Sequence, residues 1–321
     1  MNDLSIIIAA EFALAEKIAE CLEQSELVVE RLTVAEIYPF SEEQGIRFNN
    51  RAVAQVAIDE IEWSEHHYVF FAGDIEQAAY LAQASNSGCV VIDMKGVCAG
   101  LSDVPVVVPS VNDEQLGELR QRNIVALPDP QVSQAALAIA PLAQENLSQI
   151  MVTSLLPASY VSGETVNKLV GQTAQLLNGI PLDENVQRLA FDVFPVQTTD
   201  LSAQWHKIFP QIKQIIFHQV QAPVFYGLAQ SITVQSDYEL EPQISLNGWE
   251  NNEFIHYYAE KTITPVTNGE TENSEDTASL HISNLSAVEN QQNFWTVSDE
   301  QRFTLARLAV KLAESIYLQG Y

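Results

Sequence analysis

The first half of the chain alternates short apolar runs with stretches whose apolar residues recur at helical spacing. The first run, LSIIIAA (4–10), is apolar throughout, which is typical of a strand buried on both faces. Residues 12–24 follow with apolar residues on one helical face. Further strands are predicted at LVVERL (27–32), HYVFFAG (67–73), CVVIDM (89–94), VPVVVP (104–109) and NIVALP (123–128). Helical patterns at 74–85 and 113–122 separate several of these runs. The pattern predicts an α/β domain with a Rossmann-like, doubly wound parallel sheet.

The second half has a different pattern. After the turn LPDPQ (127–131), helices are predicted at 132–144 and 163–179, with a strand at 150–156 between them. Mainly strands follow, at RLAFDVFP (188–195), QIIFHQVQAP (214–223), QSITVQSD (230–237), ASLHISNLSA (278–287) and NFWTVSD (293–299). This order predicts an α+β domain with a mostly antiparallel sheet and helices on one side.

Two segments complete the predicted organisation. VTNGETENSEDT (266–277) is polar and acidic, which predicts a long loop, and residues 300–318 form a strong amphipathic helix pattern. We therefore expect one domain at 1–128, joined by the C-terminal helix at 299–321, and a second domain at 129–298.

Composition narrows the classes of partner. The 15 Lys and Arg residues stand against 42 Asp and Glu residues, which gives a net charge of −27. Such a surface repels phosphate backbones and anionic lipids, so we expect neither nucleic acid nor a membrane as partner. The N-terminus lacks the basic start of a signal peptide, and three cysteines without paired spacing favour reduced thiols in the cytoplasm. The sequence contains neither HExxH nor CxxC, so no metal site is predicted.

Five segments carry a resemblance to a known family. They are VPVVVPSVN (104–112), LLNGIPLDE (176–184), RLAFDVFP (188–195), QAPVFYGLAQS (221–231) and FWTVSDEQRFTLARLAVKLAE (294–314). In order and spacing they resemble the landmarks of the aspartate-semialdehyde dehydrogenase family, most closely its divergent branch, the Usg proteins. The resemblance covers nearly the whole chain. It implies a nucleotide-binding first domain, a dimerising second domain and hence a homodimer, with the cleft between domains as the place for a small-molecule ligand.

The family's reaction, as the resemblance implies it, is the NADPH-linked interconversion of aspartyl phosphate and aspartate semialdehyde. A cysteine thiolate attacks the carbonyl carbon and forms a thioester, a histidine acts as acid and base, and arginines hold the substrate carboxylate and phosphate. Each of these roles can be compared with the residue that stands at the matching position.

The cofactor turn departs from the family pattern. Where the family has a glycine-rich GxTGxVG-like turn, this chain has AAEFALA (9–15), with Ala9, Phe12 and Ala15 at the glycine positions. Phe12 brings bulk into the space that a pyrophosphate needs, and Glu11 adds a carboxylate at the positive end of the helix. Phe12 can also be an ordinary core residue and Glu11 a favourable early-helix acid. With either interpretation we expect no bound cofactor, or NADP if activity is retained.

The reactive positions also differ. The family's cysteine position falls on Pro130 in IVALPDPQVSQAAL (124–137), and proline has no nucleophilic atom. The family's acid–base histidine is replaced by Leu228, which cannot transfer a proton. Gln221 and Ala99 stand at the two substrate-arginine positions. Asn112 and Gly227, which shape backbone turns, are retained. The resemblance therefore implies that no catalytic residue of the family remains.

Three hypotheses for function follow. The first is a non-catalytic homologue, a pseudoenzyme with a binding or partner role, which pairs with an active relative or holds a small ligand. The second is an active NADP-dependent oxidoreductase with relocated residues, for which Cys98 or Ser133 would be the nucleophile; Cys21 and Cys89 have the pattern of packing residues. The third is a different chemistry that uses Asp74, Asp93 or Asp129, although single carboxylates at strand ends are commonly helix caps.

Overall fold

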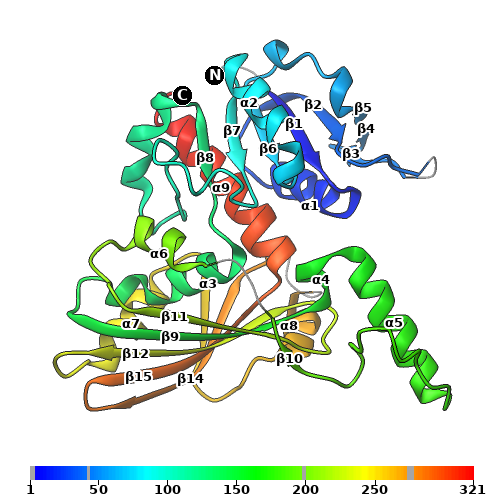
Figure 1. The fold of residues 1–321 in the computed structure, drawn as a ribbon. Coiled ribbons are helices and arrows are strands. Elements are labelled where there is room, and N and C mark those ends of the chain that lie inside the picture. The colour runs from blue at the N-terminus through cyan, green and yellow to red at the C-terminus, as the bar shows by residue number, and fades with distance from the viewer. Residues whose placement is uncertain (1–3, 42–43, 197–199, 273–277) are drawn as a thin grey trace. The chain divides into compact units, whose positions relative to one another are not determined.

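The computed structural model describes residues 4–41, 44–196, 200–272 and 278–321, and the chain forms two compact units (Figure 1). Unit 1 comprises Met1–Ser133 and Thr304–Tyr321, and unit 2 comprises Gln134–Phe303. Both divisions fall five residues later than the predicted ends at 128 and 298. Ser133 belongs with unit 1, where its hydroxyl donates to the Pro128 carbonyl, and Phe303 packs edge-on against Phe254 in unit 2.

The sheet of unit 1 is parallel and has six strands in the order β5-β2-β1-β6-β7-β8, which confirms the Rossmann-like prediction. Its central strand β1 is buried along its whole length, as the uninterrupted apolar run predicts. The strands are β1 (Leu4–Ala10), β2 (Val29–Glu36), β5 (Ala54–Ala57), β6 (Tyr68–Phe71), β7 (Val90–Asp93) and β8 (Ile124–Ala126). A separate two-stranded ribbon consists of β3 (Arg47–Phe48) and β4 (Arg51–Ala52).

The predicted strand at 104–109 is wrong. This segment makes a single bridge, between Val106 and Ala126, rather than a ladder. Pro105 and Pro109 have no amide hydrogen to donate, so the apolar run can be buried beside β8 but cannot continue the sheet. The predicted helix at 113–122 is a 3-10 helix, Asp113–Gln121, with Gly117 at its centre.

The sheet of unit 2 is mixed and mostly antiparallel, with seven strands in the order β10-β11-β9-β12-β15-β14-β13. The pairs β11–β9 and β13–β14 are parallel, and the other four pairs are antiparallel. The strands are β9 (Leu147–Leu156), β10 (Phe194–Pro195), β11 (Ile215–Gln221), β12 (Leu228–Ser236), β13 (Ile255–Tyr258), β14 (Leu280–Val288) and β15 (Gln291–Ser298). The predicted α+β class of this domain is confirmed.

The helices follow the apolar periodicity with few exceptions. They are α1 (Phe12–Glu23), α2 (Ala78–Asn86), α3 (Pro130–Ile139), α4 (Ala158–Val161), α5 (Gly163–Leu177), α6 (Ser202–Ile208), α7 (Pro242–Glu250), α8 (Pro265–Glu272) and α9 (Leu308–Leu318). In unit 2, α7 packs through the fully buried Trp249, whose indole donates to the Ala138 carbonyl of α3. The predicted C-terminal helix begins as a π-helix, Glu300–Arg307, and becomes α-helical at Leu308.

The loop predicted at 266–277 is wrong in its first part, where α8 forms. Pro265 occupies the first turn, and the side chain of Thr264 accepts from the amide of Thr267 at 3.2 Å, which caps the new helix. Residues 273–277 of that prediction lie outside the described residues.

Candidate functional site

The turn between β1 and α1 holds the residues at the predicted cofactor positions. Ala9 and Ala15 are fully buried, and Glu11 is exposed and immediately precedes α1. The ring of Phe12 packs edge-on against that of Phe40, with ring centroids 5.4 Å apart. A pyrophosphate needs free backbone amides and open space at this helix end. An exposed carboxylate and a packed aromatic ring stand there instead, so these residues do not fit that group.

A second turn of unit 1 follows β7 and contains Cys98 and Ala99. Asp93 is fully buried, and its carboxylate accepts the amide of Cys98 at 2.6 Å. Burial raises the pKa of Asp93 to about 6, although the amides of the turn act in the opposite direction. Ala99, at a predicted arginine position, is buried and has only a methyl group. The buried carboxyl of Asp93 thus holds this turn, and residue 99 provides no positive charge for a substrate.

Cys98 does not have the environment of an activated thiol. Its pKa is raised to about 11, first by burial and then by the charge of Asp93. Burial raises the pKa of Cys89 to about 11 as well, and its thiol donates to the Trp63 carbonyl. Both groups remain protonated near neutral pH, whereas nucleophilic cysteines need a lowered pKa.

At the predicted nucleophile position, Pro130 is the first residue of α3. Proline suits this place because its fixed φ fits the first helical turn and its missing amide hydrogen is not needed there. Asp129 caps the helix by accepting the amide of Gln131 at 2.9 Å. Ser133 is fully buried, and its hydroxyl donates to the Pro128 carbonyl. The segment is therefore a well-capped helix start, and Ser133 is turned into the protein rather than toward a ligand.

In unit 2, Gln221 ends β11 and Leu228 begins β12, and β9 lies between these two strands in the sheet. The Gln221 amide donates to the carbonyls of Leu156 and Ala222 at 3.0 and 3.2 Å. Leu228 is completely buried. Sequence comparison predicted that both positions lack the family's chemistry, and the geometry gives each a structural role.

The carboxylates of the third hypothesis also have structural roles. Asp74 forms an ion pair with Lys95 at 3.1 Å and caps the short helix at 75–77 together with Gln77. Asp93 holds the turn after β7, and Asp129 caps α3. Similarly, Asn112 shapes its own turn, with its side chain bonded to the backbone of Val108 and Val106.

One buried polar group near Leu228 was missed by the sequence analysis. Glu300 is 1% exposed and accepts hydrogen bonds from the Ser159 hydroxyl and from the amide of Gly227. Burial, followed by the charge of Asp299, raises its pKa to about 7. In sequence, SDEQ before a helical pattern indicates an ordinary exposed helix start. Only the packing of three distant segments reveals that this carboxyl is enclosed.

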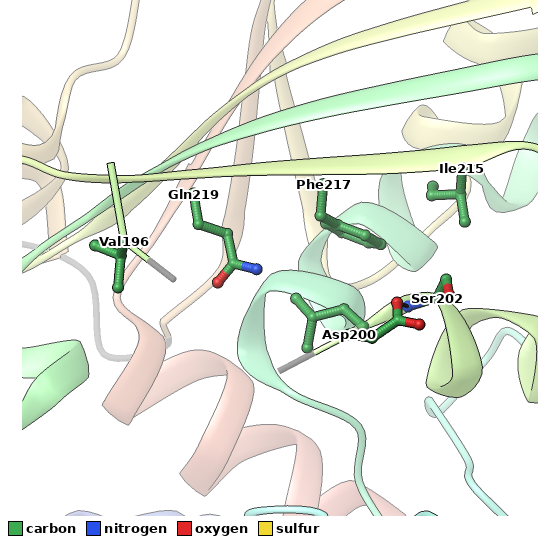
Figure 2. A pocket seen from close by; sticks show the side chains of 7 residues that line it. Val196, Asp200, Ser202, Ile215, Phe217 and Gln219 are labelled. Carbon is green, nitrogen blue, oxygen red and sulfur yellow. Dashed lines mark hydrogen bonds between the residues drawn. The ribbon is translucent and has the colours of Figure 1, made fainter. Parts of the chain in front are cut away.

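Unit 2 also contains a cavity of about 260 Å³ beside β11. Figure 2 shows the side chains of Ile215, Phe217 and Gln219 pointing from β11 toward Asp200 and Ser202. The remaining lining residues are Val196 and Leu201. Hydrogen bonds from Ser202 hold the pKa of Asp200 below its usual value, so the cavity presents a carboxylate and disfavours anions. None of the predicted site residues lines it.

An arm extends from the end of the unit 2 sheet and comprises residues 158–195, which include α4, α5 and β10 (Figure 1). It exposes a group of large apolar side chains. They are Val161, Val170, Leu177, Ile180, Phe191 and Val193, each more than half exposed or nearly so. Large apolar side chains exposed on one segment are a feature of protein association sites.

Two other classes of site are absent from the described ranges of the chain. No group of three or more His, Cys, Asp or Glu side chains there could hold a metal ion. No helix in the same ranges is both long enough and apolar enough to cross a membrane.

Comparison with known proteins gives relatives along the whole chain, although no family model matches it. A USG-1 protein homolog of Haemophilus influenzae is 60% identical over 319 residues, which is 99% of each chain. An aspartate-semialdehyde dehydrogenase of Vibrio mimicus is 31% identical over 246 residues, 72% of this chain and 78% of that one. The crystal structure of aspartate semialdehyde dehydrogenase II from Vibrio cholerae superimposes with a TM-score of 0.90 at 27% identity and covers all of both chains.

Proposed function

The chain belongs to the aspartate-semialdehyde dehydrogenase family, in its USG-1 branch, and from that premise we propose that it is a non-catalytic member with a binding or partner role in the cytoplasm. One observation carries the proposal: Pro130 and Leu228 stand where the resemblance predicts the family's nucleophile and its acid–base residue. Neither side chain can form a thioester or transfer a proton. Pro130 is also a favourable helix start and Leu228 is fully buried, so both substitutions are well accommodated.

The absence of a tight NADP site is part of the same proposal. The β1–α1 turn supports it, because Glu11 and the packed Phe12 occupy the helix end that a pyrophosphate would need. The NADP-dependent alternative with relocated residues is less well supported. It needs Cys98 as a thiolate or Ser133 as an alkoxide, and the first has a raised pKa while the second is buried.

The retained role is association through unit 2. The apolar side chains of the arm support it, and we expect the occupant of this surface to be a second copy of the chain, as in the predicted homodimer.

A small ligand would stabilise the folded protein by mass action, so a thermal-shift screen of nucleotides and amino-acid metabolites can find it.

The direct test is turnover. Purified protein is mixed with aspartate semialdehyde, phosphate and NADP, and reduced cofactor is followed by its absorbance. We expect a rate no higher than that of buffer, because loss of a covalent nucleophile can lower turnover by roughly a millionfold. An aspartate-semialdehyde dehydrogenase assayed in parallel is the positive control. Turnover that Cys98→Ser or Ser133→Ala abolishes would establish the relocated enzyme and overturn the proposal.

A further inference from the structure

The Glu300 carboxyl connects three segments of unit 2 that are far apart in sequence. It begins the π-helix after β15, Ser159 belongs to α4, and Gly227 precedes β12. The Ser159 hydroxyl and the Gly227 amide both donate to it. π-Helical turns are rare and are frequently found at functional sites. A carboxyl that accepts from two other segments is placed to hold them together.

The same two segments are joined by backbone bonds. The amides of Ala158 and Ser159 donate to the carbonyls of Val224 and Phe225, at 2.8 and 3.0 Å. Directly after α4, the side chain of Ser162 caps α5 at the amide of Thr165. The start of the arm is therefore fixed to the 224–227 turn by these backbone bonds and by the Glu300 carboxyl.

We propose that Glu300 is a proton-operated latch, whose protonated form keeps α4 fixed to the 224–227 turn and whose ionised form loosens it. An ionised carboxylate in this enclosed position lacks the hydration it would have in water, and its hydrogen bonds from the Ser159 hydroxyl and from backbone amides replace only part of that hydration. The least costly response to ionisation is a movement of α4 or of the turn that admits water. Because α4 leads into α5, the latch sets the mobility of the apolar arm.

The surroundings of Glu300 determine where this change occurs. From α4 comes the neutral Ser159 hydroxyl, from the turn comes the Gly227 amide, and from its own segment comes the carboxylate of Asp299. Asp299 in turn accepts the amides of Gln301 and Arg302, both at 2.9 Å. Burial and Asp299 favour the protonated form, whereas the hydrogen bonds from Ser159, from the amide of Glu300 itself and from Gly227 favour the ionised form. The balance is a pKa raised to about 7.

The sign of the pH effect follows from this shift. In the unlatched state the carboxyl regains an ordinary pKa near 4.5, while in the latched state it keeps its proton to about pH 7. The raised pKa therefore stabilises the latched state. This stabilisation is complete below pH 4.5 and is lost as the pH rises through 7. Between pH 6 and pH 8 the unlatching equilibrium constant should increase roughly tenfold.

Amide hydrogen exchange tests the latch on the full chain. After correction for intrinsic exchange, the protection of the Ala158 and Ser159 amides should fall about tenfold from pH 6 to pH 8. Glu300→Gln keeps the size and an acceptor oxygen but cannot ionise, so its protection should not change. Glu314→Gln is the matched control, because Glu314 is also buried and accepts the amide of Glu26 at 2.8 Å. It should behave like the unaltered protein.

Asp299→Asn provides a second variant if Glu300→Gln does not fold. It keeps the acceptor oxygen that caps Gln301 and Arg302 but removes the charge, so the midpoint of the pH dependence should move below 7. Constant protection in the unaltered protein, or an equal fall in Glu300→Gln, would overturn the latch.

The consequence for the arm rests on the proposed function. Sedimentation should show tighter self-association at pH 6 than at pH 8, and no such difference for Glu300→Gln. A chain that stays monomeric at both pH values contradicts the proposed function, and the exchange data then decide the latch separately. Association that is equal at both pH values in the unaltered protein contradicts the link between latch and arm.

Discussion

At the scale of single residues, the positions predicted to differ from the family's chemistry have definite structural roles. Pro130 starts α3, and Gln221 directs its amide donors to two backbone carbonyls. Leu228 lies in the core with no exposed surface. Each of these side chains is therefore accommodated by packing or by hydrogen bonds where it stands, in agreement with the proposed non-catalytic role.

The reactivity of Cys98 is a residue-scale prediction. Because burial and Asp93 raise its pKa from 9.0 to about 11, the thiolate population near pH 8 should be roughly a hundredfold lower than that of an unperturbed thiol. Alkylation by iodoacetamide, followed by mass spectrometry, should therefore be slow in the folded protein and fast in urea. Rapid labelling of Cys98 in the folded protein at neutral pH would contradict this expectation and support the relocated nucleophile.

At the scale of elements, α5 determines the shape of the segment that follows it. Gln172 is buried, and its side-chain oxygen accepts the amides of Leu189 and Ala190 at 2.7 and 3.2 Å. Its amide group donates to the Gln187 carbonyl at 2.8 Å. These bonds satisfy backbone groups that in a strand would bond to the neighbouring strand. Most of the predicted strand at 188–195 is therefore irregular. Within it, β10 (Phe194–Pro195) pairs in the sheet.

Replacement of Gln172 tests this dependence. Gln172→Leu should lower the free energy of unfolding by roughly 1–3 kcal/mol, because it leaves buried backbone groups without partners. It should also increase hydrogen exchange at residues 187–190. The matched control is Gln175→Leu on the same helix, since Gln175 makes one exposed bond, to the Pro181 carbonyl. Equal effects of the two substitutions in urea titrations would show that the network is not needed.

At the scale of the whole molecule, charge and apolar surface act in opposite directions on assembly. A net charge of −27 opposes the approach of a second copy, while the exposed apolar side chains of the arm favour it. Because salt screens repulsion between exposed charges and leaves apolar burial largely unaffected, self-association should strengthen as salt is added.

The arm can be tested with two leucines of similar exposure. Leu177, on the arm, is 74% exposed, and Leu318, near the C-terminus in unit 1, is 78% exposed. Leu177→Asp should weaken dimerisation at least roughly tenfold by sedimentation, the equivalent of about 1.4 kcal/mol, and Leu318→Asp should leave it unchanged. If Leu318→Asp is the one that dissociates the dimer, the arm is not the interface.

The sequence by itself determined the elements whose apolar pattern is set locally. The fully apolar run at 4–10 became β1, and the amphipathic patterns at 12–24 and 163–179 became α1 and α5. The identities of Pro130 and Leu228, on which the proposal of lost catalysis rests, were also readable in sequence, because the absence of a functional group does not depend on folding. Periodicity and side-chain identity are local properties, so a local pattern is sufficient for both.

Only the tertiary structure decided which backbone groups would find partners and which polar groups would be enclosed. Gln172, for example, holds the backbone of Leu189 and Ala190 by side-chain bonds in place of a strand ladder. Glu300 is ordinary in sequence and became a buried carboxyl because α4 and the Gly227 turn close over it. Hydrogen-bond satisfaction and desolvation depend on residues distant in the chain, so neither follows from a local pattern.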